Sequence, residues 1–588
     1  MSRYAQLQDN PPQLTYEEDL GFTGLDTETD RDKLDRGKYS RGENTRCHRI
    51  ADATGAAVTQ RGGVQTPVFA NVVPMTILGS GVFSNPNGEE VQLHATATGV
   101  QLIKSGSYPR ALTLPMGTTL TGKINFSQQF NVVLLHREDG GPTLVWDGIT
   151  SGFTRVNKFN PADTSTVIIP NPPWSINFGY RAVFPTGPDT LGASDELDYT
   201  SIDIANNNFR INTGEAASIV GAHAFRKNQI IVGNSRSLDV LTGFIGDLAN
   251  ASMDVLNTEV NLAARKAMAM VGADLFLLAS KPAGGVFRVS EIDLSGSLMA
   301  EPVPVSDKVQ TLIDRINWPY AGGAIMQTHG IYLFVFAPID DSTVNNSALV
   351  FNTVSREWVG IDLFDPGAVF QIDDAYEADF FGTKGLYVAN HAANLIHLYG
   401  DGDDQDQLGL AFDGNGNPQF AVFNIPYVFE SRGYATLGHI AGDYYAHPGA
   451  TTRDFKRSEF GLKTLRPSIT ATLLGEGAFD ERILTPIPVS RSPVKYDRFG
   501  LNNWNPSNAN NDFSTPGRQD YSVDWTSEFS LPAAGINVEQ LQHTPLKVST
   551  KARSRFVSYR IVNSQGRCDV TEELIESAGV GREPKRGG

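Results

Sequence analysis

Carboxylates are the residues of this chain whose types and spacing come nearest to those of a catalytic site. The densest group beside aromatic side chains lies in the segment TGPDTLGASDELDYT and consists of Asp189, Asp195, Glu196 and Asp198. Glycoside hydrolysis needs two carboxylates at a defined separation, or a Tyr nucleophile supported by arginines. These four acids stand in no recognisable catalytic motif. Because Asp side chains commonly cap turns, we interpret the group as part of a surface loop.

A second acidic segment, GDGDDQDQLGLAFDGNGNP at Gly400–Pro418, is a candidate cation site. Its first acids are Asp401, Asp403, Asp404 and Asp406. They alternate as Ca²⁺ ligands do, but the segment lacks the sixth-position Gly and the downstream bidentate Glu of an EF-hand loop. We therefore expect a solvated acidic loop, with a bound Ca²⁺ as the alternative.

The remaining motifs supply no catalytic and no cofactor-binding residue. The chain has no G-x-S-x-G nucleophile elbow, no Walker A loop and no H-E-x-x-H zinc motif. His94 and His136 fall in strand patterns, so we expect them to be packed or surface side chains rather than ligands. The sequence thus predicts a protein without enzymatic activity and assigns no cofactor or metal.

The composition is that of a folded soluble chain. Hydrophobic residues make up 40% and charged residues 19% of its 588 residues. No apolar run approaches the roughly 18 residues that cross a bilayer, and the N-terminus lacks an apolar signal region, so we expect neither membrane insertion nor secretion. Cys47 and Cys568 are the only cysteines. We expect two reduced thiols, with a bridge between the chain ends as the alternative.

The formal net charge of −17 bears on nucleic acid as a partner. Affinity for phosphates comes from Lys and Arg, so a chain this acidic is not expected to wrap DNA. It could line a passage that DNA traverses without sticking.

Short strands joined by polar turns account for most of the chain. In one hairpin, Val132–His136 is a strand, Glu138–Gly141 the turn and Thr143–Trp146 the returning strand. Similar units recur at irregular spacing over residues 218–241, 268–289, 323–358 and 378–398. Degenerate repeats of small sheets predict an all-β fold, a β-propeller with long insertions, extended N- and C-terminal segments and few helices. A pair of long β-sandwiches is the alternative.

Three segments stand out from this pattern. Phe153–Ile211 is expected to be an insertion that projects from the scaffold. Ser306–Asn317 has an N-cap and apolar residues at helical spacing, which predicts a helix. Leu256–Leu262 alternates polar and apolar residues, which favours a strand.

The stretch Leu34–Pro67 marks where the strands begin. Ala56–Gln60 is a predicted strand, and Gly62-Gly63 the tight turn that fixes the register of the first blade. We divide the chain into an extended N-terminal arm (1–33), a β-propeller (34–440) and a β-rich C-terminal region (441–588) that completes or decorates the propeller. The polar arm is expected to become ordered against a partner, with a disordered tail as the alternative.

Basic residues cluster near the start of the chain and on late strands. Candidates for contacting the acidic surface of a neighbouring copy or of another subunit are Arg36, Arg41, Arg46, Arg49, Arg453, Lys456 and Arg457. The alternative is a solvated basic loop and solvated strand faces.

Several stretches, in this order, resemble the β-propeller tail hub and nozzle proteins of short-tailed, podovirus-type bacteriophages. They are NTRCHRI, VTQRGGVQTPVF, FSQQFNVVLLHREDGGPTLVWDG, NFGYRAVFPTGPDTLGASDELDYTSID, IVGAHAFRKNQIIVGNSRSLDVLTG, VGADLFLLASKPAGGVFRV and YLFVFAPIDDSTVNNSALVFNTVSREWVGID. The resemblance covers residues 34–465. Its motifs are structural rather than catalytic, and the C-terminal part of the chain departs from it.

The resemblance implies a non-enzymatic virion protein, made in the host cytoplasm and located in the tail. It implies a homo-oligomeric ring, usually sixfold, around the DNA exit channel, with adaptor and fibre proteins as neighbours and DNA passing without specific binding. Two other hypotheses remain. One is a propeller glycan hydrolase or lyase acting on a host-surface polysaccharide, and the other is a WD-repeat scaffold, which predicts regular repeats of roughly 40–45 residues.

Overall fold

The structure is a computed structural model that divides into two compact units. The first comprises Met1–Phe22, His48–Gln60 and Arg432–Gly588, and the second Thr23–Cys47 and Arg61–Ser431. The residues described are 14–49, 55–65, 76–85, 87–104, 110–156, 171–202, 206–211, 217–226, 228–244, 246–291, 298–300, 303–364, 370–380, 383–391, 395–400, 405–412, 418–434, 453–465, 468–474, 482–484, 542–554 and 556–579.

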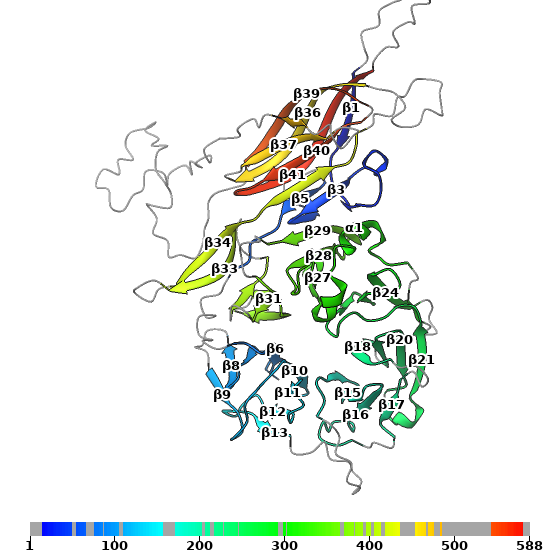
Figure 1. The fold of residues 1–588 in the computed structure, drawn as a ribbon, viewed down its shortest axis with the longest axis vertical. Coiled ribbons are helices and arrows are strands. Elements are labelled where there is room, and N and C mark those ends of the chain that lie inside the picture. The colour runs from blue at the N-terminus through cyan, green and yellow to red at the C-terminus, as the bar shows by residue number, and fades with distance from the viewer. Residues whose placement is uncertain are drawn as a thin grey trace, which may run out of the picture. The chain divides into compact units, whose positions relative to one another are not determined.

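The second unit is a β-propeller. Among the described residues, seven antiparallel sheets follow one another along the chain, and the innermost strand of each contacts the innermost strand of the next. These strands are β6, β10, β14, β18, β22, β26 and β30, and β30 contacts β6 again, so the ring closes (Figure 1). We call the sheets blades 1 to 7.

Each of the first five blades is a four-stranded meander. Blade 1 consists of β6 (Gly79–Ser84), β7 (Glu90–Ala95), β8 (Gly99–Lys104) and β9 (Arg110–Thr113), and blade 2 of β10 (Ile124–Gln129), β11 (Val132–Arg137), β12 (Leu144–Trp146) and β13 (Thr154–Arg155). Blade 3 consists of β14 (Ile176–Phe178), β15 (Arg181–Gly187), β16 (Thr190–Ala193) and β17 (Asn208–Arg210), and blade 4 of β18 (Ile219–Arg226), β19 (Gln229–Asn234), β20 (Leu238–Thr242) and β21 (Ser252–Asn257). Blade 5 consists of β22 (Met268–Val271), β23 (Asp274–Ala279), β24 (Gly285–Glu291) and β25 (Leu298–Ala300).

Blade 6 is a four-stranded meander that is extended by distant segments. Its meander is β26 (Ile325–His329), β27 (Tyr332–Ala337), β28 (Ser347–Asn352) and β29 (Glu357–Leu363). Next to β29 lie β3 (Lys38–Glu43), then β35 (Tyr427–Ser431), while β2 (Gly24–Leu25) pairs with β3. A hairpin of β33 (Gln405–Phe412) and β34 (Pro418–Asn424) precedes β35.

Blade 7 closes the ring with a segment from earlier in the chain. Its strands are β30 (Asp374–Phe380), β31 (Thr383–Asn390) and β32 (Leu395–Leu398). Gln65 pairs antiparallel with Leu398 through two backbone hydrogen bonds of 2.9 and 2.8 Å. The segment that precedes blade 1 thus supplies the fourth, outer position of blade 7.

Burial on both faces explains why the second strand of several blades is rich in apolar residues. In β11, β23 and β27 every residue after the first is buried, and the sequences are VVLLHR, DLFLLA and YLFVFA. Such strands lie between two neighbouring blades, and each fully buried large apolar side chain contributes about 1.5–3 kcal/mol. Between blades 1 and 2, for example, Phe83, Leu93, Val133 and Trp146 share one cluster.

Innermost strands approach one another closely near the ring axis. A Cβ atom on Gly79 in β6 would lie 2.0 Å from the backbone oxygen of Ile124 in β10. Only glycine fits there, which explains a small residue at the start of an innermost strand.

The first unit is a β-structure built from both ends of the chain. In one sheet β36 (Arg453–Leu465) lies between β39 (Gln542–Ser554) and β41 (Arg567–Gly579), and the other edge of β41 pairs with β1 (Leu14–Asp19) and β5 (Ala56–Gln60). A second group pairs β37 (Ile469–Leu474) with β38 (Arg482–Leu484) and β40 (Ser558–Asn563). The strand β4 (Thr45–Arg49) spans a boundary between the units.

Helical structure is sparse in the described residues. It consists of α1 (Gln310–Ile313) and the 3₁₀ turns η1 (Arg31–Lys33), η3 (Leu248–Asn250), η4 (Asp307–Val309) and η5 (Trp318–Gly323). No helix within the described ranges is long and apolar enough to cross a membrane.

The all-β propeller class and the hairpin at residues 132–146 are confirmed, because β11 and β12 pair as predicted. The predicted helix within Ser306–Asn317 is present but short, and Ser306 does not cap it. Its hydroxyl instead accepts a hydrogen bond of 3.0 Å from the Val286 amide. The predicted strand at Leu256–Leu262 is wrong beyond Asn257, where β21 ends.

Other predictions about the fold are wrong. The segment Phe153–Ile211 is no simple insertion, because it contains blade 3. Gly62-Gly63 forms no turn, and neither glycine has a positive φ; the segment leads in extended form to the closing pair at Gln65. The predicted strand Ala56–Gln60 exists as β5, but it pairs with β41 and not with blade 1.

The predicted domain limits also differ from the observed units. The arm 1–33 is not separate, because β1 pairs with β41 over six residues. The compact unit that holds the C-terminal region begins at Arg432 rather than at 441, and it also includes the N-terminal segments Met1–Phe22 and His48–Gln60. The predicted acidic loop Gly400–Pro418 contains β33, and its residues 401–404 and 413–417 lie outside the described residues.

Candidate functional site

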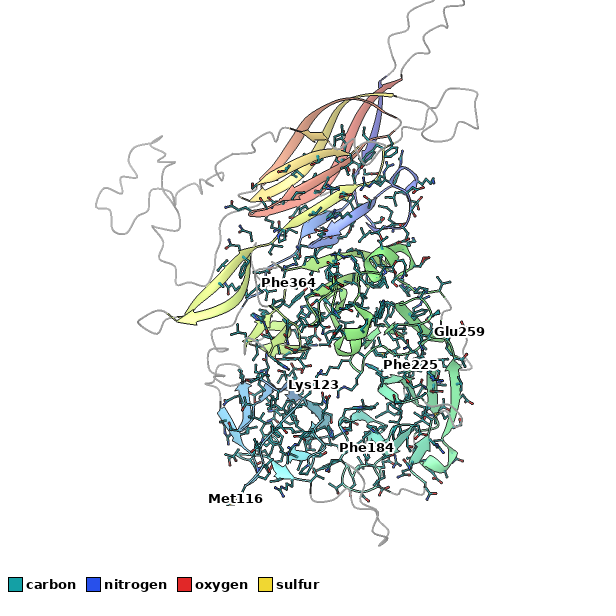
Figure 2. All side chains as sticks on the ribbon, viewed as in Figure 1. Met116, Lys123, Phe184, Phe225, Glu259 and Phe364 are labelled. Atoms are coloured by element: carbon teal, nitrogen blue, oxygen red, sulfur yellow. The ribbon has the colours of Figure 1, made fainter. Side chains whose placement is uncertain are left out.

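The starts of several innermost strands bring charged side chains together around the propeller axis. We call this group the axial cluster, and Figure 2 shows Lys123 on the inner side of the ring. Lys123 precedes β10, the pair Arg265-Lys266 precedes β22, and Asp374 begins β30. The full axial cluster is Lys123, Asn125, Glu138, Arg265, Lys266, Asp374 and His391.

Asp374 is the buried anion of the axial cluster. The Lys266 ammonium contacts one carboxylate oxygen, and the Ser80 amide donates to the other at 3.0 Å. Burial alone would raise the pKa of Asp374, but the Lys266 charge and hydrogen bond hold it below its usual value. This carboxyl group therefore stays ionised at neutral pH.

Arg265 and Asn125 connect blades 5 and 2. One guanidinium nitrogen of Arg265 donates to the Asn125 side-chain oxygen, and another lies 3.9 Å from a Glu138 carboxylate oxygen. The Asn125 amide in turn donates to Glu138 at 3.0 Å and to the Pro173 carbonyl at 2.9 Å. Burial lowers the pKa of Arg265, which indicates a guanidinium with little access to water.

Lys123 and the His391 ring complete the cluster. Burial lowers the pKa of Lys266, Asp374 raises it, and the positive charges of Arg265 and Lys123 lower it further. Burial also lowers the pKa of His391, with Asp373 and Asp374 opposing that effect and Lys123 and Lys266 adding to it. The positive charges of Lys123 and Lys266 thus oppose protonation of His391.

A second buried charge network stabilises the propeller away from the axial cluster. The Arg46 guanidinium donates to both oxygens of Asp362 at 2.7 Å, and Tyr399 donates to Asp362 at 2.5 Å. Arg61 makes the same two-pronged pair with Asp406, at 2.7 and 2.5 Å. Bidentate pairs of this kind fix geometry as well as charge.

The N-terminal basic residues of the predicted interface take up different positions. Arg46 is only 7% exposed and pairs inside the unit, so this residue offers no surface to a neighbouring copy. Arg41 is half-exposed and bonds to Glu43 and Glu430. Arg36 and Arg49 are exposed and remain surface candidates.

The late basic residues of that set lie on one strand. Arg453, Lys456 and Arg457 belong to β36, whose backbone pairs with β39 on one side and β41 on the other. Their side chains lie outside the part of the chain whose side chains the structure describes.

The acidic groups singled out in the sequence serve local structure where they are described. Asp195 accepts hydrogen bonds from Ser201 at 2.6 Å and from Asn207 at 3.0 Å, and Asp198 accepts one from the Thr200 amide at 2.9 Å. The turn interpretation is thus confirmed for both aspartates. Asp401, Asp403 and Asp404 lie outside the described residues, while Asp406 forms a buried ion pair with Arg61. Within the described ranges no group of acids, His and Cys is placed to hold a metal ion.

The predicted packing of the histidines and thiols is confirmed. Burial lowers the pKa of His94 and of His136 to about 3, so both rings are neutral at pH 7. Their ring nitrogens bond to serine hydroxyls, Ser80 for His94 and Ser175 for His136, at 2.9 and 2.8 Å. Cys47 and Cys568 are both buried and form no disulfide.

The axial cluster was not predicted from the sequence. Its members lie in or next to short strands of three different repeats, which are blades 2, 5 and 7. The one local signal is the pair Arg265-Lys266 immediately ahead of an apolar strand. Lys123, Lys266 and Asp374 lie within two residues of the start of their innermost strands, but the irregular repeat spacing hides this in the sequence.

Comparison with known proteins finds no matching protein-family model and no matching curated protein. Among solved structures, BamB of Moraxella catarrhalis aligns with a TM-score of 0.34 and 12% identity, over 60% of this chain and 95% of BamB. The WD40 propeller domain of Doa1 aligns with a TM-score of 0.34 and 9% identity, over 58% and 96%. The propeller domain of Cps50 (Swd1) from Myceliophteria thermophila gives 0.35 and 9%, over 54% and 96%. The fold assignment rests on the closed ring of seven blades.

Proposed function

We propose that this chain is a non-enzymatic structural protein of a bacteriophage particle, a subunit of the tail nozzle or hub. Its copies form a sixfold ring around the DNA exit channel, next to adaptor and fibre proteins. The chain is made in the host cytoplasm and works in the virion tail. It does not insert into a membrane.

The observation that carries this proposal is that two buried carboxylates, Asp362 and Asp374, are held in the ionised form. Burial would raise the pKa of Asp362, but the charge and hydrogen bonds of Arg46 hold it below its usual value, and Lys266 does the same for Asp374. A general acid must hold a proton at the working pH, and these two carboxylates do not. Both carboxylates form ion pairs within the propeller, which fits a structural role.

The charge of the chain also fits passage of DNA. A ring of copies that each carry a net charge of −17 repels phosphates on average, so DNA can slide without being held. The resemblance to tail hub and nozzle proteins over residues 34–465 is the reason for proposing a position in the tail.

Assembly state is the direct test in solution. We expect the full chain at micromolar concentration to form one closed oligomer of defined mass, measured by light scattering and by native mass spectrometry. A chain that stays monomeric both in solution and in the assembled particle would overturn the proposal.

A glycan hydrolase or lyase is the second candidate. The observation in its favour is that two carboxylates, Glu138 and Asp374, both raise the pKa of Arg265 near the axis through their negative charges. This candidate predicts that host-surface polysaccharide is shortened by the chain, and that Asp374→Asn abolishes the shortening. An intact polysaccharide after prolonged incubation would exclude it.

A further inference from the structure

Arg265 has more hydrogen-bond donors than acceptors around it. A guanidinium carries five N–H donors. In the described residues, Arg265 donates one hydrogen bond, to Asn125, and its other recorded partner is Glu138 at 3.9 Å. That distance is beyond hydrogen-bonding range. A side chain only 19% exposed thus keeps donors without an acceptor.

Lys123 lies two residues before Asn125, the hydrogen-bond partner of Arg265, and the His391 backbone amide donates to Asp373, the neighbour of Asp374. Lys123 is half-buried and forms no ion pair or side-chain hydrogen bond with any residue that the structure describes. The Nε2 atom of His391 is buried and has no hydrogen-bond partner among those residues. A buried polar atom without a partner costs about 1–3 kcal/mol, so the His391 Nε2 atom calls for a missing partner.

The acids nearby are already engaged. Lys266 and the Ser80 amide occupy Asp374. Asp373 accepts from the Gln371 side chain at 2.6 Å and from the His391 amide at 2.8 Å. Glu138 accepts from Asn125 at 3.0 Å. These carboxylates already accept hydrogen bonds from other groups, whereas Lys123, Arg265 and the His391 ring keep polar hydrogens or nitrogens without a partner among the described residues.

We propose that the axial cluster binds a small oxyanion of the phosphate type between Lys123, Arg265 and His391. Its oxygens accept from the Lys123 ammonium, the free guanidinium N–H groups and the His391 ring, and its charge offsets the mutual repulsion of Lys123, Arg265 and Lys266. The anion is held by blades 2, 5 and 7, so it would link strands that are far apart in the sequence. This inference does not depend on the proposed role in a phage tail.

Titration of the full chain with inorganic phosphate tests the site. In a buffer without other oxyanions, calorimetry is expected to show saturable binding, and phosphate should raise the unfolding temperature more than sodium chloride at equal ionic strength. Lys123→Gln removes a charge-assisted hydrogen bond and is expected to weaken binding about tenfold or more. Lys123→Arg should restore most of the affinity.

The matched control is Lys308→Gln, which removes an exposed lysine outside the axial cluster. It should bind phosphate as the parent chain does. Circular dichroism and elution volume check that each variant is folded. An effect of phosphate no larger than that of chloride, or unchanged affinity in Lys123→Gln, would overturn the inference.

A second arm separates two sources of the same chemistry. Deoxyadenosine monophosphate is added to the phosphate-saturated chain. Displacement of phosphate assigns the site to phosphate groups of nucleotides, and failure to displace it assigns the site to the free anion. Both results support an oxyanion site.

Discussion

At the scale of single residues, buried arginines neutralise buried carboxylates in the propeller. Arg61 is fully buried, with Asp406 on its two terminal nitrogens, Asn44 at 2.8 Å from Nε and the Phe364 ring 4.9 Å from the guanidinium. The sequence indicated basic residues in this region but predicted surface contacts for them. Burial of Arg46 and Arg61 could not be foreseen, because their partners Asp362 and Asp406 lie more than 300 residues away.

Arg61→Met is expected to destabilise the propeller by about 3–5 kcal/mol, because it leaves Asp406 buried without a counter-ion. Urea unfolding followed by fluorescence gives the free energy of unfolding. The control is Arg41→Met, whose side chain is 46% exposed and whose loss should cost at most about 1 kcal/mol. Equal losses in the two variants would contradict the assigned role of Arg61.

The buried histidines predict how stability depends on pH. Burial lowers the pKa of His94, His136 and His397 to about 3, whereas an unfolded His titrates near pH 6.5. The unfolded chain therefore binds more protons between these values. The stabilisation is fully present above about pH 6.5 and is lost as pH falls toward 3, by about 1.4 kcal/mol per pH unit for each ring.

Unfolding titrations from pH 7 to pH 4.5 measure this slope. His136→Gln keeps a side chain able to hydrogen-bond with Ser175. It is expected to reduce the slope of unfolding free energy against pH by the amount that corresponds to about one bound proton. A variant with the same slope as the parent chain would show that this ring does not resist protonation in the folded state.

At the scale of elements, the hairpins were predictable and the ring closure was not. Strands such as β27 are buried on both faces and read as apolar runs, which sequence patterns reveal directly. Blade 3 escaped prediction because β14 and β17 have only three residues each. The closing pair of Gln65 with Leu398 joins segments far apart in the sequence, and no local signal marks it.

Gln65→Pro tests this closure. Proline removes the N–H group that donates to the Leu398 carbonyl, so amide hydrogen exchange in β32 should become faster. Gln65→Ala keeps the N–H group and should leave exchange in β32 unchanged. Unaltered exchange in the proline variant would mean that this pair does not hold blade 7.

A deletion of residues 1–19 tests the role of β1. Asp19 is buried and accepts from the Arg432 guanidinium at 2.7 Å and from the Tyr434 hydroxyl at 2.9 Å. The deletion removes the Arg432–Asp19 ion pair and the backbone partner of residues 573–578 in β41, so the first unit should unfold at lower temperature and be cut faster by protease. A deletion variant that folds as stably as the parent but assembles less well would instead support an arm that reaches a neighbouring copy.

At the scale of the whole molecule, the chain supplies a seven-bladed ring and a second β-unit built from both chain ends. The all-β propeller could be predicted because short apolar strands and polar turns repeat along the chain. The number of blades and the unit boundaries could not, because they depend on pairings between distant segments such as β1 with β41. A role in a ring of identical subunits is a property of assembled copies, which neither one sequence nor one chain contains.

Imaging this chain in its native particle by electron cryomicroscopy tests the central claim most directly. The account predicts a sixfold ring of copies at the tail, with DNA passing through the ring without ordered contacts to the protein. A particle in which the chain is absent from the tail, or is present there only as isolated single copies, would contradict it.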